Sequence, residues 1–279
     1  MSSFDVPGII RIDEGRGSLP RVSITGDQAT AEIYLHGAHL TQWTPRGAKP
    51  VLFMSGKSWF EPNKPIRGGV PVCFPWFGPK EGSPSHGYAR LRDWDLESCE
   101  RRSDGAVRVA FSLDAEESSL RLSFGIGRDL EMDLEVRAKR EFTFEEALHT
   151  YLRVGDVRRV SVEGLEKTDY LDKADASRRK TEPGEPIRIA AETDRQYLST
   201  RSTCVVRDPL FERVITVAKE GSDTTVVWNP WIAKAKAMPD FGDDEWPDML
   251  CVETANAGES AVRLQPGQTH HMKARVTVS

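Results

Sequence analysis

The sequence has few cysteines, no excess of positive charge and no long apolar run. Its 279 residues include four cysteines without a C-x-x-C pair, so we expect neither a metal site nor a disulfide framework. With 38 Lys plus Arg against 43 Asp plus Glu, the net charge of −5 argues against nucleic acid or an anionic membrane as the main partner. An anionic ligand therefore needs a few arginines that concentrate positive charge locally.

Membrane and targeting segments are missing as well. No window approaches the roughly 18 consecutive apolar residues of a spanning helix. The N-terminal MSSFDVPGIIR lacks a basic start followed by an apolar core, so we expect no secretory signal. We expect a cytoplasmic protein, and a monomer is the expected state.

Nucleotide-binding signatures are incomplete. Residues 55–58 (SGKS) end like a phosphate loop, but Val51 stands where its first glycine belongs. Two G-x-G pairs lack a third glycine and lie outside any βαβ pattern. The sequence therefore favours a protein without a cofactor.

The dominant pattern is alternation of apolar and polar residues with the period of a strand. Turn residues recur at short intervals, as in a many-stranded antiparallel sandwich. The expected strands are Arg21–Thr25, Ala29–His36, Val107–Leu113, Arg121–Ile126, Glu131–Ala138, Val205–Arg207, Val214–Val217, Thr224–Trp228 and Met272–Val278.

Little of the chain is expected to be helical. We predict one helical turn at Asp114–Ser119 and another near Trp231–Met238, and we expect the polar segment Ser177–Arg188 to be a surface loop. No repeat or linker divides the chain. The sequence thus predicts an all-β fold, a large antiparallel β-sandwich with few short helices, as a single domain over residues 1–279.

Two loops carry arginines beside glycines. Arg67 lies in the Pro-rich, aromatic segment Lys64–Pro79, where its guanidinium can present a planar fork to a carboxylate or phosphate. The loop Ser85–Arg90 carries His86 and Arg90, a pair that suits oxygen recognition more than metal binding. A buried structural arginine in the first loop, and solvated side chains in the second, are the alternatives.

Two titratable residues lie in apolar strand-like runs. Ala147, His149 and Tyr151 share one face of a predicted strand, where a lone histidine is more often part of the core than catalytic. Glu253 follows the apolar run Leu250–Val252, and a carboxylate there is costly unless paired. This makes Glu253 a general-base candidate.

Other acidic residues are less informative. Asp194 is either a turn cap or an acceptor for a hydroxyl group. Asp243, Asp244, Glu245 and Asp248 are expected on a solvated loop face.

Six segments together resemble the aldose 1-epimerase (galactose mutarotase-like) superfamily, and within it the hexose-6-phosphate mutarotase (glucose-6-phosphate 1-epimerase) branch. In chain order they are RGGVPVCFPWFGP, SHGYAR, EEALHTYLRVGDV, ETDRQYL, VVWNPW and CVETANA. The resemblance covers about positions 20 to 270. It implies a large antiparallel β-sandwich with the sugar site on the concave face of one sheet.

The resemblance implies that His149 and Glu253 are the catalytic residues. Interconversion of anomers needs a base at the C1 hydroxyl and an acid at the ring oxygen, without metal or redox cofactor. Glu253 is assigned the base and His149 the acid. We expect a nearby carboxylate to hold the pKa of His149 near or above its ordinary value of ~6.5.

The resemblance also implies five substrate-binding residues: Arg67, Ser85, His86, Arg90 and Asp194. The two arginines are expected at the phosphate, because guanidinium forks bind phosphate bidentately. The resemblance implies a glutamine at position 85, as in related phosphosugar enzymes, but this chain has Ser85. This departure leaves the sugar preference open.

The predicted function is a cofactor-independent epimerase that interconverts the anomers of hexose 6-phosphates, with D-glucose 6-phosphate as the first candidate. One alternative is a carbohydrate-binding or metabolite-sensing protein without catalysis. Another is a glycosidase or lyase with two carboxylates. The third is an aldose 1-epimerase for unphosphorylated sugars.

Overall fold

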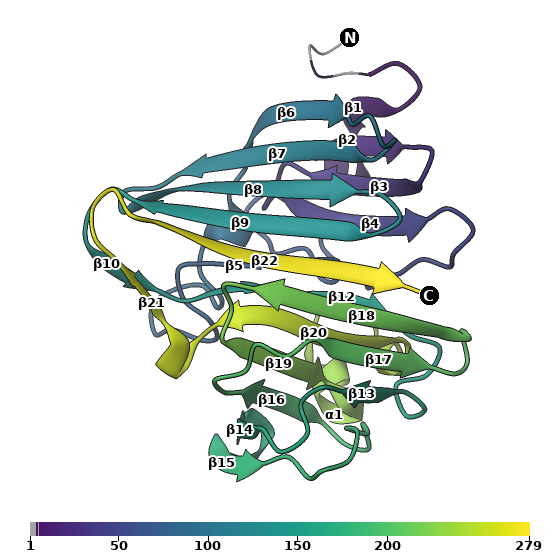
Figure 1. Ribbon diagram of the computed structural model, residues 1–279, viewed down its shortest axis with the longest axis vertical. Helices are drawn as coiled ribbons and strands as arrows, with labels where there is room; N and C mark the ends of the chain where they lie inside the picture. The colour runs from purple at the N-terminus through teal and green to yellow at the C-terminus, as the bar shows by residue number, and fades with distance from the viewer. Residues whose placement is uncertain (1–3, 5) are drawn as a thin grey trace.

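Two eight-stranded antiparallel sheets dominate the computed structural model, which describes Phe4 and residues 6–279 (Figure 1). One, here called the β9 sheet, has the strand order β13-β17-β18-β22-β9-β8-β7-β6. Its strands are β6 (Asp95–Arg101), β7 (Val107–Asp114), β8 (Ser118–Ile126), β9 (Leu130–Ala138), β13 (Ser161–Glu163), β17 (Cys204–Asp208), β18 (Arg213–Glu220) and β22 (Thr269–Val278).

The second, here called the β20 sheet, has the order β15-β14-β16-β19-β20-β11-β5, and β12 also pairs with β20. Its strands are β5 (Val72–Cys73), β11 (Glu146–Leu148), β12 (Tyr151–Arg153), β14 (Asp169–Asp172), β15 (Arg178–Thr181), β16 (Thr193–Tyr197), β19 (Thr224–Asn229) and β20 (Met249–Asn256).

The remaining elements are smaller. A four-stranded sheet of β1 (Ile10–Glu14), β2 (Pro20–Thr25), β3 (Ala29–Tyr34) and β4 (His39–Pro45) lies behind the β6–β9 end of the β9 sheet in Figure 1. The strands β10 (Phe142–Phe144) and β21 (Val262–Leu264) pair to form a separate two-stranded sheet. Helix α1 spans Trp231–Ala237, and 3-10 turns lie at Arg16–Ser18, Ala89–Leu91, Lys173–Asp175, Trp246–Asp248 and Gly258–Ser260.

Strand alternation produces the core. In β9 every second residue from Leu130 to Ala138 is buried, while the residues between them are exposed or half-buried. One continuous hydrophobic cluster joins the two eight-stranded sheets and the four-stranded sheet, and it includes Ile33, Leu134 and Val252. Each fully buried Leu, Ile or Val contributes about 1.5–3 kcal/mol to this core. The fold is the predicted antiparallel β-sandwich.

Strand β20 differs because all eight of its residues are buried. Leu250, Cys251 and Val252 all belong to the core cluster, and strand alternation puts Leu250 and Val252 on one face and Cys251 and Glu253 on the other. Pairing with β19 on one side, and with β11 and β12 on the other, satisfies the backbone of this central strand. A buried carboxylate is thereby fixed at the centre of a rigid sheet.

The expected strands are all present, but two local predictions are wrong. Residues 114–119 form a hairpin turn between β7 and β8 instead of a helical turn, closed by a hydrogen bond from Ala115 N–H to the Ser118 carbonyl. Part of the expected loop 177–188 is the strand β15, whose polar side chains pair across to β14, as Lys180 does with Asp172. The helix predicted near Trp231 is confirmed as α1. Among the described residues no helix is long and apolar enough to cross a bilayer.

Candidate active site

His149 and Glu253 meet on the face of the β20 sheet that also carries Cys251. The pairing of β11 and β12 with β20 sets Leu148 opposite Thr254 and Tyr151 opposite Cys251, which places His149 alongside Glu253. The Nδ1 atom of His149 lies 3.3 Å from Oε1 of Glu253. The two predicted catalytic residues are therefore neighbours, although 104 positions separate them in the sequence.

Both side chains are buried and incompletely satisfied. The side chain of His149 is 9% exposed and that of Glu253 is 1% exposed. Although the two are at ion-pair distance, neither Nδ1 of His149 nor Oε2 of Glu253 has a hydrogen-bond partner among the described residues. Buried polar atoms without partners are rare in folded proteins, so this arrangement is typical of a site that awaits a ligand.

Burial sets the protonation of this pair in the direction opposite to our expectation. Desolvation, together with the nearby His86, Arg67 and Arg90, lowers the pKa of His149 well below its ordinary value. Burial and the Asp194 carboxylate raise the pKa of Glu253 well above its ordinary value. This direction is contrary to the expectation that the pKa of His149 stays near or above ~6.5, because desolvation of the imidazole outweighs any support from the neighbouring Glu253 carboxyl group.

Aromatic rings fix the orientation of His149. Its ring stacks on Tyr151 with centroids 4.8 Å apart and an interplanar angle of 11°. Trp228 approaches edge-on at 6.0 Å, and His86 approaches edge-on at 5.6 Å. The predicted strand is interrupted here, because His149 and Thr150 lie between β11 and β12, but the stacking puts the His149 ring on the same side as Tyr151.

His86 is held as a neutral ring with a defined tautomer. Its Nδ1 accepts a hydrogen bond from Gly78 N–H at 3.2 Å, so the ring proton resides on Nε2. Burial, helped by nearby arginines, lowers the pKa of His86 to about 3. The following Gly87 is required here, because a Cβ atom would lie 1.9 Å from the Phe74 carbonyl oxygen. The backbone thus holds His86 as a hydrogen-bond donor beside His149.

Arg67 is already paired in the protein. Its Nη2 and Nε lie 3.0 and 3.1 Å from the same oxygen of Asp240, and Nη1 donates to the Tyr151 hydroxyl at 3.0 Å. Burial alone would lower the pKa of Arg67, but the charges and hydrogen bonds of Tyr151 and Asp240 outweigh it and raise that pKa. Arg67 therefore offers at most part of its hydrogen-bonding capacity to a ligand.

Arg90 is the less satisfied of the two arginines. Nη2 donates to the Ser85 carbonyl at 2.6 Å, and Nε has no hydrogen-bond partner among the described residues. Burial lowers the pKa of Arg90, but from a value so high that the group stays charged. The residue is 8% exposed, and a buried guanidinium without a carboxylate partner is suited to bind an anion. The exposed Ser85 contacts Arg90 through its backbone.

Asp194 lies on β16 at the other side of the site. It is in register with Trp228, which is in register with Cys251 on β20, so the three share one row across the sheet. Lys234 of α1 approaches its carboxylate at 3.5 Å. Burial raises the pKa of Asp194 although Lys234 opposes this. The carboxylate is half-buried and can accept hydrogen bonds from a ligand.

Three site residues were not predicted from the sequence. Tyr151 and Cys251 could have been found, because each is two residues from a predicted catalytic residue on the same strand face. Asp240 could not, because its role depends on the fold of the segment after α1 against the loop that carries Arg67.

Of the four acidic residues expected on a solvated loop face, Asp243 and Asp244 are exposed, and Asp243 pairs with the exposed Lys57. Glu245 and Asp248 are half-buried instead, and the Glu245 carboxylate accepts hydrogen bonds from the N–H groups of Gly56 and Gly242.

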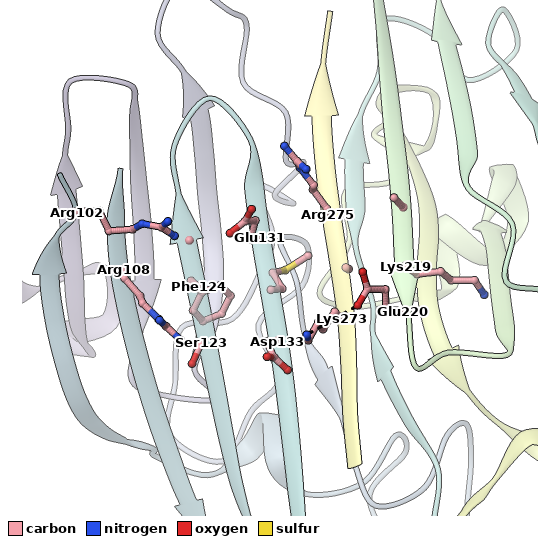
Figure 2. A pocket seen from close by; sticks show the side chains of 14 residues that line it. Arg102, Arg108, Ser123, Phe124, Glu131, Asp133, Lys219, Glu220, Lys273 and Arg275 are labelled. Carbon is pink, nitrogen blue, oxygen red and sulfur yellow. Dashed lines mark ion pairs between the residues drawn. The ribbon is translucent and has the colours of Figure 1, made fainter. Parts of the chain in front are cut away.

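A separate hollow lies on the β9 sheet. This cavity of about 490 Å³ is lined by strands from β7 to β18, and Figure 2 shows charges of both signs around it. Lys273 pairs with Glu220 at 3.8 Å, and Arg275 pairs with Asp129. Its lining contains none of the seven predicted site residues, all of which belong to the described part of the chain. These pairs occupy part of the charge in the lining, and none of the predicted site residues lies there, so the candidate active site is the one at the β20 sheet.

Comparison with known proteins places this geometry in a family. The model of the family "Aldose 1-epimerase" matches residues 20–277. The chain belongs to the aldose 1-epimerase family. A Cenchrus ciliaris protein named "Putative glucose-6-phosphate 1-epimerase" is 39% identical over 268 residues, which covers 89% of this chain and 80% of that protein. An Escherichia coli K12 protein of the same name is 37% identical over 253 residues, covering 87% and 85%.

Solved structures of other proteins show the same fold. The crystal structure of a Salmonella typhimurium protein described as "a putative mutarotase (YeaD)" superposes with a TM-score of 0.92 at 30% identity, covering 99% of this chain and 95% of that one. A galactose 1-epimerase from Lactobacillus acidophilus, at 13% identity, superposes with a TM-score of 0.74 over 97% and 98% of the two chains. The latter likeness shows the fold alone.

Proposed function

We propose that this aldose 1-epimerase family member interconverts the α and β anomers of hexose 6-phosphates, with D-glucose 6-phosphate as the first candidate. The observation that carries the proposal is the contact of the buried His149 and Glu253, whose Nδ1 and Oε1 atoms lie 3.3 Å apart. Arg90, whose Nε has no hydrogen-bond partner among the described residues, lies near this pair. The names of the relatives support the phosphorylated substrate.

The reaction uses one proton shared by the pair. Glu253 removes the proton of the C1 hydroxyl while His149 protonates the ring oxygen, and the C1–O5 bond breaks to give the open aldehyde. After rotation about C1–C2, the ring closes on the other face of the carbonyl, with the two roles exchanged. Each positioned acid or base lowers the barrier by about 3–5 kcal/mol.

Burial raises the pKa of Glu253 and lowers that of His149, whereas ring opening by this route needs the imidazole protonated and the carboxyl group ionised. Arg67 and Arg90 contribute to the low pKa of His149. A phosphate dianion bound to Arg90 offsets this positive field and favours protonation of the imidazole. The phosphate thus acts on the acid electrostatically in addition to anchoring the sugar.

The other residues orient the ring of the sugar. His86 presents its Nε2–H as a donor, and Asp194 accepts hydrogen bonds from hydroxyl groups on the opposite side. Arg67 is a positioning residue, because Asp240 and Tyr151 hold most of its donors. Ser85 contributes its carbonyl to Arg90, so its short side chain does not alter the anchor.

We also infer that residues 1–279 form one domain that works as a cytoplasmic monomer. One core cluster extends from Ile10 to Val276, which supports a single domain.

Magnetisation-transfer NMR of anomer exchange at C1, with glucose 6-phosphate and glucose in parallel, tests the substrate. We expect acceleration for the phosphosugar only, relative to enzyme-free controls. Equal acceleration of both sugars would retain the chemistry and reject the phosphate anchor. No acceleration of either would favour a sugar-binding protein.

A further inference from the structure

We propose that His149, Cys251 and Glu253 form a binding site for a borderline-soft divalent cation such as Zn²⁺, and that the bound cation inhibits the enzyme. One ligand atom from each residue lies within 4.8 Å of the other two, and all three residues are buried. The site overlaps the proposed catalytic pair but needs no catalytic activity to exist.

The sheet places the three ligand atoms together. Cys251 and Glu253 are two residues apart on β20, so their side chains leave the strand on the same face. The pairing of Tyr151 with Cys251 brings β12, and with it the preceding His149, alongside. No loop has to fold over to complete the set, so the three donors are ordered in advance.

Two of the donor atoms lack partners in the protein. Nδ1 of His149 and Oε2 of Glu253 are buried without hydrogen bonds to any described residue. Leaving such atoms unsatisfied costs about 1–3 kcal/mol each. A cation that accepts both lone pairs offsets this cost, which gives the site a driving force beyond proximity.

The donor chemistry selects the cation. Imidazole nitrogen, thiolate sulfur and carboxylate oxygen are the donors that zinc prefers, and three protein ligands leave one position open. Mg²⁺ and Ca²⁺ prefer oxygen ligands alone. Tetrahedral bonds of about 2.0–2.3 Å need ligand atoms about 3.3–3.8 Å apart, so the side chains must close by about 1 Å. Rotation about the side-chain bonds of Glu253 can supply this movement.

The surrounding charges are balanced enough to admit a cation. Arg67 and Arg90 oppose binding, while the Asp194 carboxylate favours it. Coordination releases the thiol proton of Cys251 and the proton shared by His149 and Glu253 to solvent, and the resulting thiolate and carboxylate offset the charge of the cation. The bound cation then occupies the lone pairs that would otherwise transfer protons, so the reaction stops.

Cobalt titration tests the site directly, because Co²⁺ substitutes for Zn²⁺ and gives a near-ultraviolet charge-transfer band when bound to a thiolate. The protein carries no histidine tag and is first dialysed against EDTA. We expect one Co²⁺ per chain with this band, and displacement of Co²⁺ by Zn²⁺. Absence of the band in the wild-type protein would overturn the proposal.

Variants identify the ligands. Cys251→Ala should abolish the band and weaken Zn²⁺ binding by at least about 10–100-fold, since even outer-shell changes cost that much. Cys204→Ala is the matched control, because Cys204 is 2% exposed and lies on β17 of the other large sheet. A band that persists in Cys251→Ala, or that disappears in Cys204→Ala, would place the metal elsewhere and reject the site.

A second variant covers the case in which Cys251→Ala does not fold. Glu253→Gln should keep the charge-transfer band, because the thiolate remains, but weaken Zn²⁺ binding; unchanged affinity would exclude Glu253 as a ligand and overturn the site. Inhibition of anomer exchange by Zn²⁺, reversed by EDTA, is the functional consequence. A protein that shows the cobalt band but no anomer exchange would retain the cation site and reject the proposed function.

Discussion

Asp240 binds the guanidinium of Arg67 across a gap of 173 residues in the sequence. The contact joins the segment that follows α1 to the loop before β5, where Arg67 precedes two glycines. Arg67 also donates a hydrogen bond to the Tyr151 hydroxyl. Because Tyr151 stacks on His149, we expect the orientation of the proposed catalytic imidazole to depend on a carboxylate that does not touch it. Asp240 is thus a positioning residue.

Replacing Asp240 tests this role through stability. Asp240→Asn should lower the free energy of unfolding by about 2–3 kcal/mol, because the guanidinium of Arg67 remains buried without its charged partner. Urea denaturation at pH 7 measures the effect. Asp243→Asn is the matched control from the same segment, where the exposed pair with Lys57 should leave stability unchanged. Equal effects of the two substitutions would show that Asp240 has no special role.

The two arginines should behave differently towards substrate. Arg90→Met should raise KM for glucose 6-phosphate about 10–100-fold, since a charged hydrogen bond to phosphate is worth about 1.5–3 kcal/mol. Arg67→Met should lower kcat as well, because Tyr151 and His149 lose their support. Steady-state kinetics of anomer exchange separate the two cases, with circular dichroism as a check on folding. An unchanged KM in Arg90→Met would place the phosphate elsewhere.

Buried neutral histidines predict loss of stability in acid. Burial lowers the pKa of His39 to about 3, while the unfolded chain titrates near its ordinary value of ~6.5. Below that pH the unfolded state binds a proton that the folded state does not, so stability falls as pH falls from ~6.5 towards about 3.

The His39 contribution can be isolated by substitution. Its Nε2 donates to the Gly68 carbonyl at 2.8 Å, and His39→Gln can keep a donor there without titrating. Urea denaturation between pH 7 and pH 5 should show the loss of stability reduced by about 2 kcal/mol in the variant, an average of about 1 kcal/mol per pH unit. Identical slopes would mean that the pKa of His39 is the same in the folded and unfolded states.

Strand alternation made most of the fold predictable. The run from Leu130 to Ala138 alternates at the period of a strand, and the structure buries every second residue of it. The segment Arg178–Thr181 does not alternate and is rich in charge, so nothing local indicates that it pairs as β15. Its pairing depends on ion pairs with β14 that only the folded chain provides.

The proximity of His149 and Glu253 could be expected from the motifs, but the electrostatics around them could not. Motifs indicated His149 and Glu253, and the sheet brings them together. Their protonation depends on how deeply both are buried and on Arg90, which approaches from a distant loop; no local pattern encodes this. The same holds for Asp240, whose partner Arg67 is known only once the chain has folded.

Anomer exchange of glucose 6-phosphate, measured by magnetisation transfer for the wild type, His149→Asn and Glu253→Gln, tests the central claim most directly. His271→Asn is the control, because this histidine lies on β22 and pairs with Asp133 away from the site. We predict that each catalytic substitution lowers the exchange rate by about 10²–10⁴-fold while the phosphosugar still binds, and that the control retains the wild-type rate. Exchange near the wild-type rate in either catalytic variant would contradict the account.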